Sequence, residues 1–161
     1  MPWLEIITVA CLGYGLYLAL LSSPADYQQG DAVRIMYIHV PAAWIALSSY
    51  LLLGICAFFF LIWRHPLAEI AARSIAPIGT GFAVITLITG SLWGKPIWGV
   101  WWVWDGRLTS MLILFFFFMG YLALSNAFEQ TERGARPAAI LALIGCINLP
   151  IVKFSVDWWH T

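Results

Sequence analysis

The chain has 161 residues, of which 62% are hydrophobic and 10% are charged, and its formal net charge is zero. A mean hydropathy of +0.86 lies far outside the range of ordinary soluble domains, so we expect an integral membrane protein in contact with lipid. No basic stripe or patch is visible, which leaves no argument for a nucleic-acid partner.

Five apolar segments are each long enough to cross a membrane, since a spanning helix needs about 20 apolar residues. They cover about residues 3–22, 42–63, 71–92, 108–128 and 137–155. We interpret the first as a retained span, because Glu5 stands where a secretory signal has basic residues. Asn148 and Pro150 predict a kink in the fifth. The sequence therefore predicts an all-α, polytopic transmembrane helix bundle that forms one domain over residues 1–161.

An odd number of spans places the two termini on opposite sides of the membrane and divides the basic residues into two groups. One side receives Arg64, Arg73, Arg133 and Arg136, and the other receives Arg34, Lys95, Arg107 and Lys153. The first group is confined to two short loops, which favours that side as cytoplasmic. Residues around His39, the tryptophan-rich segment and the C-terminus then share the outer side.

Residues 93–108 read WGKPIWGVWWVWDGRL, and five of the ten tryptophans of the chain lie in the first twelve of them. A lipid-facing segment would be rich in Leu, Ile and Val and free of charge. We interpret this segment as a loop at the membrane surface that receives a large, flat, apolar ligand. The alternative is an interfacial aromatic belt, in which Trp is generally enriched.

Two of the three histidines, His39 and His160, belong to the same outer side. Imidazole is a suitable ligand for iron, and two imidazoles on opposite faces of a porphyrin would supply both axial bonds. Large rigid contact surfaces would come from the indoles of Trp98, Trp101, Trp102 and Trp104. The alternatives are a helix-entry role for His39 and a frayed chain end for His160.

Charged side chains flank these tryptophans. Lys95 and Arg107 could pair with carboxylates such as haem propionates. Asp105 could cap the helix expected to begin near Arg107, or orient a ligand by a hydrogen bond.

Enzymatic motifs are missing from the sequence. Cys11, Cys56 and Cys146 lie singly in apolar runs, and the chain has no C-x-x-C, H-E-x-x-H, G-x-S-x-G or phosphate-binding glycine loop. The scarcity of ionisable residues within the spans argues against a proton-coupled pump. We therefore predict a protein that is not an enzyme.

The tryptophan-rich segment, extended to WGKPIWGVWWVWDGRLTS, is similar to the "WWD" signature of the haem exporter protein C family of cytochrome c maturation System I. SPADYQQG, YIHVPAA, APIG and NLPIVKFSVDWW resemble other stretches of that family in the same order, over about residues 20–161. The resemblance implies haem b as a transient cargo, held on the outer face and presented to the haem chaperone CcmE. It also implies CcmD and the CcmA/CcmB transporter as partners, in a bacterial or mitochondrial inner membrane.

By this resemblance His39 in YIHVPAA matches the first haem-ligand histidine of the family. The signature itself is matched by Trp98, Gly99, Trp101, Trp102, Trp104, Asp105 and Arg107. The family continues beyond the final tryptophan pair to a second ligand histidine and a sixth span, whereas this sequence ends at Thr161. Either His160 substitutes as the second iron ligand, or the chain is a truncated member that lacks it.

Three hypotheses follow. The leading one is a membrane protein that binds haem and delivers it for the biogenesis of c-type cytochromes. A fragment of a cytochrome c synthetase or haem lyase would instead attach haem covalently, and the small size of the chain counts against it. A haem permease subunit would transport its solute through the bundle, which the few polar residues within the spans disfavour.

Overall fold

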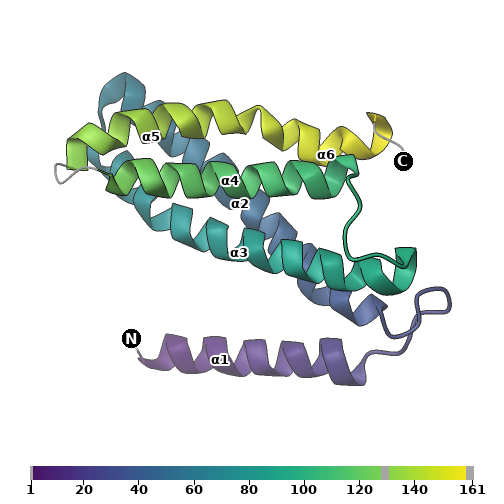
Figure 1. The fold of residues 1–161 in the computed structure, drawn as a ribbon. Coiled ribbons are helices and arrows are strands. Elements are labelled where there is room, and N and C mark those ends of the chain that lie inside the picture. The colour runs from purple at the N-terminus through teal and green to yellow at the C-terminus, as the bar shows by residue number, and fades with distance from the viewer. Residues whose placement is uncertain (1, 128–130, 159–161) are drawn as a thin grey trace.

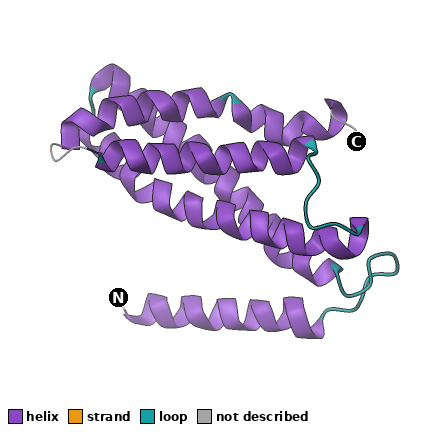
Figure 2. Ribbon diagram, in the orientation of Figure 1, coloured by secondary structure: helices purple, strands orange, loops and turns teal. Residues whose placement is uncertain are grey.

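The computed structural model describes residues 2–127 and 131–158, and every regular element in them is helical (Figures 1 and 2). In chain order these are α1 (Pro2–Tyr17), the π-helical turn η1 (Leu18–Ser22), α2 (Val33–Trp63), α3 (Pro66–Trp98), α4 (Gly106–Asn126), α5 (Thr131–Cys146) and α6 (Asn148–Trp158). The predicted all-α class is confirmed. Helices suit this composition because in lipid every backbone polar group must be satisfied within the chain.

Five helical segments of the described chain are long and apolar enough to cross a membrane, as predicted. They are Pro2–Ser22, Val33–Trp63, Pro66–Trp98, Gly106–Asn126 and Gly134–Ser155. The last is interrupted between α5 and α6 at Ile147, next to the Asn148 that predicted a kink. The side-chain Nδ2 of Asn148 donates to the carbonyl of Ser110 at 2.8 Å, so the break is tied to α4.

Helices α2 and α3 are longer than the sequence predicted, and this changes the setting of two candidate regions. His39 lies in the second turn of α2, not at its start, and residues 93–98 of the tryptophan-rich segment continue α3 instead of forming a loop. The predicted spans, 42–63 and 71–92, leave out Pro41 and Pro96, whereas both prolines lie inside helices. A proline removes one hydrogen bond, and neighbouring helices make this tolerable within a membrane bundle.

Helices α2 to α6 pack as a bundle in which α3 lies along α2, and α4 packs against both α3 and α5. Its core contains the fully buried side chains of Tyr50, Leu53, Leu114 and Phe118, and many alanines surround them. Small residues let membrane helices approach closely, which is how such bundles gain packing contacts. Helix α1 has no buried residue and extends apart from α3 to α6 in Figure 1.

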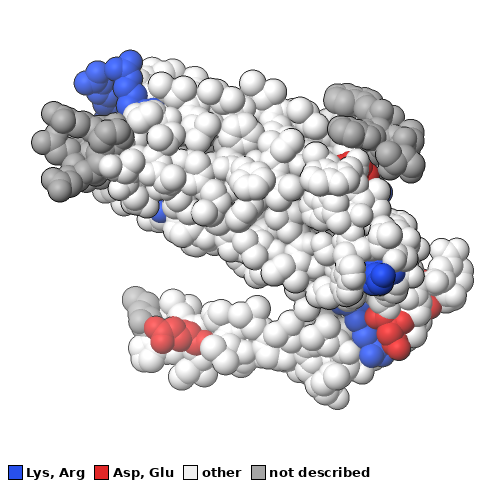
Figure 3. All heavy atoms as spheres, viewed as in Figure 1, with Lys and Arg blue, Asp and Glu red and all other residues white. Residues whose placement is uncertain are grey.

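Because the helices alternate in direction, the bundle has two ends, which we name by their residues. The tryptophan end contains residues 23–32 and 99–105 and the end of α6, and the arginine end contains residues 64–65 and the start of α5. The predicted grouping of the His39 region with the tryptophan-rich segment is confirmed. Charged side chains gather towards these ends, and the middle of the visible face is uncharged (Figure 3).

One close helix contact gives a test of this packing. A Cβ at Gly79 of α3 would overlap the ring of Phe118 and lie 2.9 Å from Cβ of Ser49. We expect Gly79→Val to lower the free energy of unfolding by about 1–3 kcal/mol through overpacking, measured by denaturation in detergent. Gly81→Val, on the same helix with no atom within 4 Å of its Cβ, is the control. Equal effects of both changes would contradict the packing described here.

Candidate functional site

A cavity of about 350 Å³ opens at the tryptophan end between α2, α3, α4 and α6. This volume lies within the range of small-molecule sites, which are typically apolar with a few polar groups. The polar and aromatic residues that line it are His39, Thr86, Trp93, Trp98 and Arg107. The remaining lining is apolar, including Met36, Leu87 and Met111. Three of the predicted site residues therefore meet at one cavity: His39, Trp98 and Arg107.

The imidazole of His39 is held by a hydroxyl from the neighbouring helix. Its Nδ1 lies 3.0 Å from Oγ1 of Thr89, and that hydroxyl donates its own hydrogen to the carbonyl of Ile85 at 2.7 Å. The hydroxyl must then accept, so we assign the proton to Nδ1 and leave Nε2 with a free lone pair. A neutral imidazole with one nitrogen anchored and the other unprotonated is the form that binds metal ions.

Gly90 gives the His39 ring its space. A Cβ at this position would lie 3.2 Å from Cε1 of His39, which is closer than ordinary van der Waals contact. Sequence reasoning missed both Thr89 and Gly90, because nothing in a segment 50 residues away indicates that it packs against His39. Thr89 and Gly90 are adjacent on α3, so one supplies a hydrogen-bonding hydroxyl to the His39 ring and the other, having no side chain, leaves room for it.

Two tryptophans at the end of α3 form an aromatic wall of the cavity. The rings of Trp93 and Trp98 meet edge to face, with centroids 5.1 Å apart and planes at 86°. Nε1 of Trp93 donates to Oε1 of Gln29 at 2.9 Å, which ties residues 23–32 to α3. That turn is ordered by Asp26, whose Oδ1 accepts from the backbone N–H groups of Gln29 and Gln28. These hydrogen bonds lower the pKa of the Asp26 carboxyl.

Gly99 ends α3 in the left-handed conformation, with φ of +77°, which favours glycine. Its N–H donates to the carbonyl of Lys95 at 3.0 Å, and Nζ of Lys95 donates to the carbonyl of Gly99 at 2.8 Å. The same ammonium lies 5.8 Å from the ring centroid of Trp101. Gly99 therefore shapes the turn, and Lys95 stabilises the helix end without lining the cavity.

The other tryptophans of the signature lie in residues 99–105, outside the cavity lining. Trp101 and Trp104 are 55% and 66% exposed, and Trp104 meets Trp102 edge to face at 5.6 Å. Nε1 of Trp102 is buried with no hydrogen-bond partner in the part of the chain that the structure describes. The four predicted tryptophans thus divide into one cavity residue, Trp98, and three in the loop that follows it.

Asp105 is the N-cap of α4, which confirms the capping interpretation. Its buried carboxylate accepts from the N–H of Leu108 at 2.8 Å, and its second oxygen lies 3.9 Å from Nε of Arg107. Such a cap satisfies an otherwise unpaired helical N–H. It also sets where α4 begins, and so where Arg107 lies beside the cavity.

The predicted second histidine, His160, lies outside the described residues. Among the residues that the structure does describe, no group of three or more His, Cys, Asp or Glu side chains could hold a metal ion. Cys11, Cys56 and Cys146 are free thiols. The candidate site is therefore one imidazole, His39, in an apolar cavity with aromatic walls and a cation.

A polytopic helical bundle with this cavity at one end defines a membrane protein that has a candidate small-molecule site lined by an imidazole, two indoles and a guanidinium. The chain belongs to the CcmC family, described as heme exporter protein C, whose match covers residues 1–161. The family resemblance read from the sequence motifs is confirmed.

Individual relatives agree with this assignment. The heme exporter protein C of Bradyrhizobium diazoefficiens is 53% identical over 161 residues, which are all of this chain and 61% of that protein. The protein of the same name from Escherichia coli K12 is 49% identical over 99% of this chain and 65% of its own length. A ccmC-like mitochondrial protein of cytochrome c biosynthesis from Marchantia polymorpha is 48% identical over 91% of this chain and 61% of its own length. The chain thus spans less than two thirds of these relatives.

Proposed function

We propose that this chain binds haem b as a transient cargo at the tryptophan end, in the biogenesis of c-type cytochromes. The observation that carries the proposal is His39, which lines an apolar cavity while Thr89 occupies its Nδ1. The names of the relatives, heme exporter protein C and a protein of cytochrome c biosynthesis, support the same cargo.

The residues present fit haem in three respects. His39 offers a neutral nitrogen to iron, the indoles of Trp93 and Trp98 offer apolar contact, and Arg107 offers a partly exposed guanidinium to a propionate. The cavity lies near the small end of ligand sites, so part of the macrocycle would remain outside it. The exposed indoles of Trp101 and Trp104 are suited to cover that part.

We further propose that the chain delivers haem without chemically changing it. Among the residues that the structure describes, those that line the cavity supply a ligand, apolar contact and one positive charge, but no carboxylate for acid–base chemistry. A half-open site suits a cargo that must leave, with CcmE as receiver and CcmD and CcmA/CcmB as partners at a bacterial or mitochondrial inner membrane. The second axial ligand is His160 or a group from another part of the assembly.

Haem titration of the detergent-purified chain tests the proposal. We expect saturable binding with a Soret band, and about tenfold weaker binding for Trp98→Ala, because the loss of one aromatic contact costs about 1 kcal/mol beyond its buried area. Trp3→Ala, on the exposed α1, is the matched control and should bind as the unchanged chain does. Binding that does not saturate, or equal losses in the two variants, would contradict a site at this cavity.

A further inference from the structure

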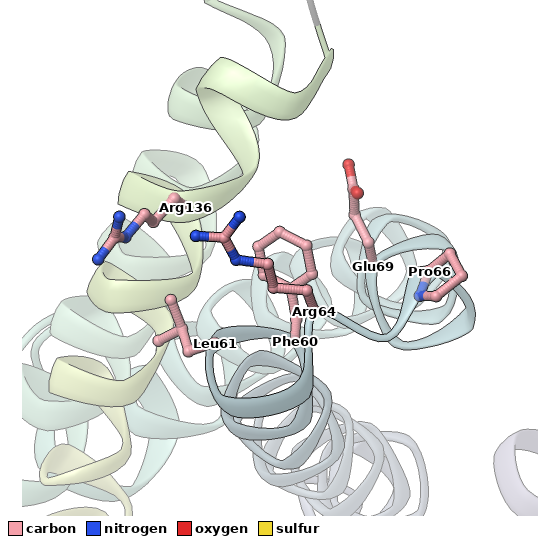
Figure 4. Close-up of a pocket in the computed structure, with 6 residues that line it drawn as sticks. All are labelled: Phe60, Leu61, Arg64, Pro66, Glu69 and Arg136. Carbon is pink, nitrogen blue, oxygen red and sulfur yellow. The ribbon is translucent and has the colours of Figure 1, made fainter.

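A second cavity, of about 370 Å³, lies at the arginine end where α2 ends, α3 begins and α5 passes (Figure 4). It is lined by Phe60, Leu61, Arg64, Pro66, Glu69 and Arg136. The lining has two parts: an apolar floor from the last turn of α2, and charged groups at the mouth. Nothing in the proposed haem function uses this cavity.

Among the described residues that line this cavity, the single carboxylate, that of Glu69, is engaged with an arginine outside the lining. Oε1 of Glu69 accepts from Nε of Arg73 at 3.1 Å, and Arg73 also donates to the carbonyl of Ser125 at 3.0 Å. Within the part of the chain that the structure describes, no carboxylate forms an ion pair with Arg64 or Arg136. In Figure 4 the guanidinium of Arg64 extends towards α5 at Arg136, whose own guanidinium points away from Arg64. An anion bound in this cavity would offset the positive charge of its lining and accept hydrogen bonds from guanidinium groups that reach it.

Arg64 stands in a backbone conformation that does not favour arginine. Its φ of 49° and ψ of 38° are left-handed, and its N–H caps α2 by donating to the carbonyl of Phe60 at 2.8 Å. It is the only non-glycine residue with positive φ among those that the structure describes. Glycine is the usual residue at such a cap, so the capping geometry does not account for the guanidinium.

The neighbouring residues place this cavity at the depth of lipid headgroups. Trp63 immediately precedes Arg64, is 61% exposed and stacks on Phe59, with ring centroids 5.2 Å apart. Exposed tryptophans at the ends of spanning helices mark the membrane interface. Phe60 and Leu61 then lie on the hydrocarbon side of the arginines, and basic pockets between spanning helices at this depth suit anionic lipid headgroups.

We propose that the cavity at the arginine end binds the phosphate headgroup of an anionic phospholipid. Arg64 and Arg136 donate to the phosphate oxygens, and the acyl chains lie along the apolar surface of α2. A lipid headgroup and free phosphate would both be recognised through the same phosphate–guanidinium hydrogen bonds. The apolar floor of the cavity favours the lipid, because only the lipid has acyl chains to place there.

The test is native mass spectrometry of the detergent-purified chain with phosphatidylglycerol or phosphatidylcholine. We expect phosphatidylglycerol to be preferred, and Arg64→Gly combined with Arg136→Gln to weaken its binding about tenfold. The control combines Lys95→Gln with Arg107→Gln, which removes two positive charges from the opposite end and should leave lipid binding unchanged. Arg64→Gly alone should also weaken phosphatidylglycerol binding. Its unfolding temperature should equal or exceed that of the unchanged chain, because glycine suits the left-handed cap of α2.

Three results would overturn the proposal: no preference for phosphatidylglycerol, equal losses in the double variant and its control, or unchanged binding by a folded Arg64→Gly chain. Millimolar inorganic phosphate provides the remaining comparison. If phosphate displaces the lipid completely at that concentration, the ligand is free phosphate and the lipid assignment is wrong. If the lipid remains bound, its acyl chains contribute as proposed.

Discussion

Replacement of His39 by alanine is expected to weaken haem binding at least about a hundredfold, because among the residues that the structure describes it is the imidazole that lines the cavity. Trp93, Trp98 and Arg107 would still offer apolar contact and charge, so weak association without an iron–nitrogen bond should remain. The measurement is haem titration of the detergent-purified variant, followed by the Soret band and by the iron–histidine signature in resonance Raman spectra.

His65→Ala is the matched control for this change. His65 is exposed and precedes α3 at the arginine end, away from the haem cavity, so its loss should leave both the affinity and the spectrum unchanged. Circular dichroism should show the same helical content for both variants. A His39→Ala chain that binds haem within threefold of the unchanged chain, with an intact iron–histidine signature, would exclude His39 as the axial ligand.

Replacement of Thr89 by valine is expected to weaken haem binding by about 10–100-fold, although Thr89 does not line the cavity. Valine has nearly the shape of threonine but cannot accept the 3.0 Å hydrogen bond from Nδ1 of His39. The ring then loses the contact that orients it and keeps the proton away from Nε2. The effect should therefore pass through His39, which makes Thr89 a positioning residue.

Thr89→Ser separates the hydroxyl from the overall shape of the side chain. Serine keeps the hydroxyl and should restore most of the affinity, whereas valine should shift both the iron–histidine stretching frequency and the reduction potential of bound haem. If valine and serine weaken binding equally and neither shifts the frequency, Thr89 acts only through packing and the tautomer assignment is wrong.

Much of the architecture is determined locally, and the sequence alone was enough to predict it. Five apolar runs specify five helices because hydrocarbon requires both apolar side chains and internally satisfied backbone. The break before Asn148 and the cap at Asp105 were also predictable from the sequence, because each depends only on residues within one helical turn. The family motifs also led from the sequence to His39, Trp98 and Arg107.

Other features depend on how helices pack, and only the tertiary structure revealed them. Pro41 and Pro96 lie inside α2 and α3, so His39 is helical and Trp98, at the end of α3, is separated from the tryptophans that follow it. Thr89 meets His39, and Arg64 shares a cavity with Arg136, across distances in sequence that no local pattern spans. Apolar periodicity shows that a helix is buried, but the register between two helices depends on contacts of individual side chains, such as Gly79 with Phe118. That register decides which polar groups share a cavity.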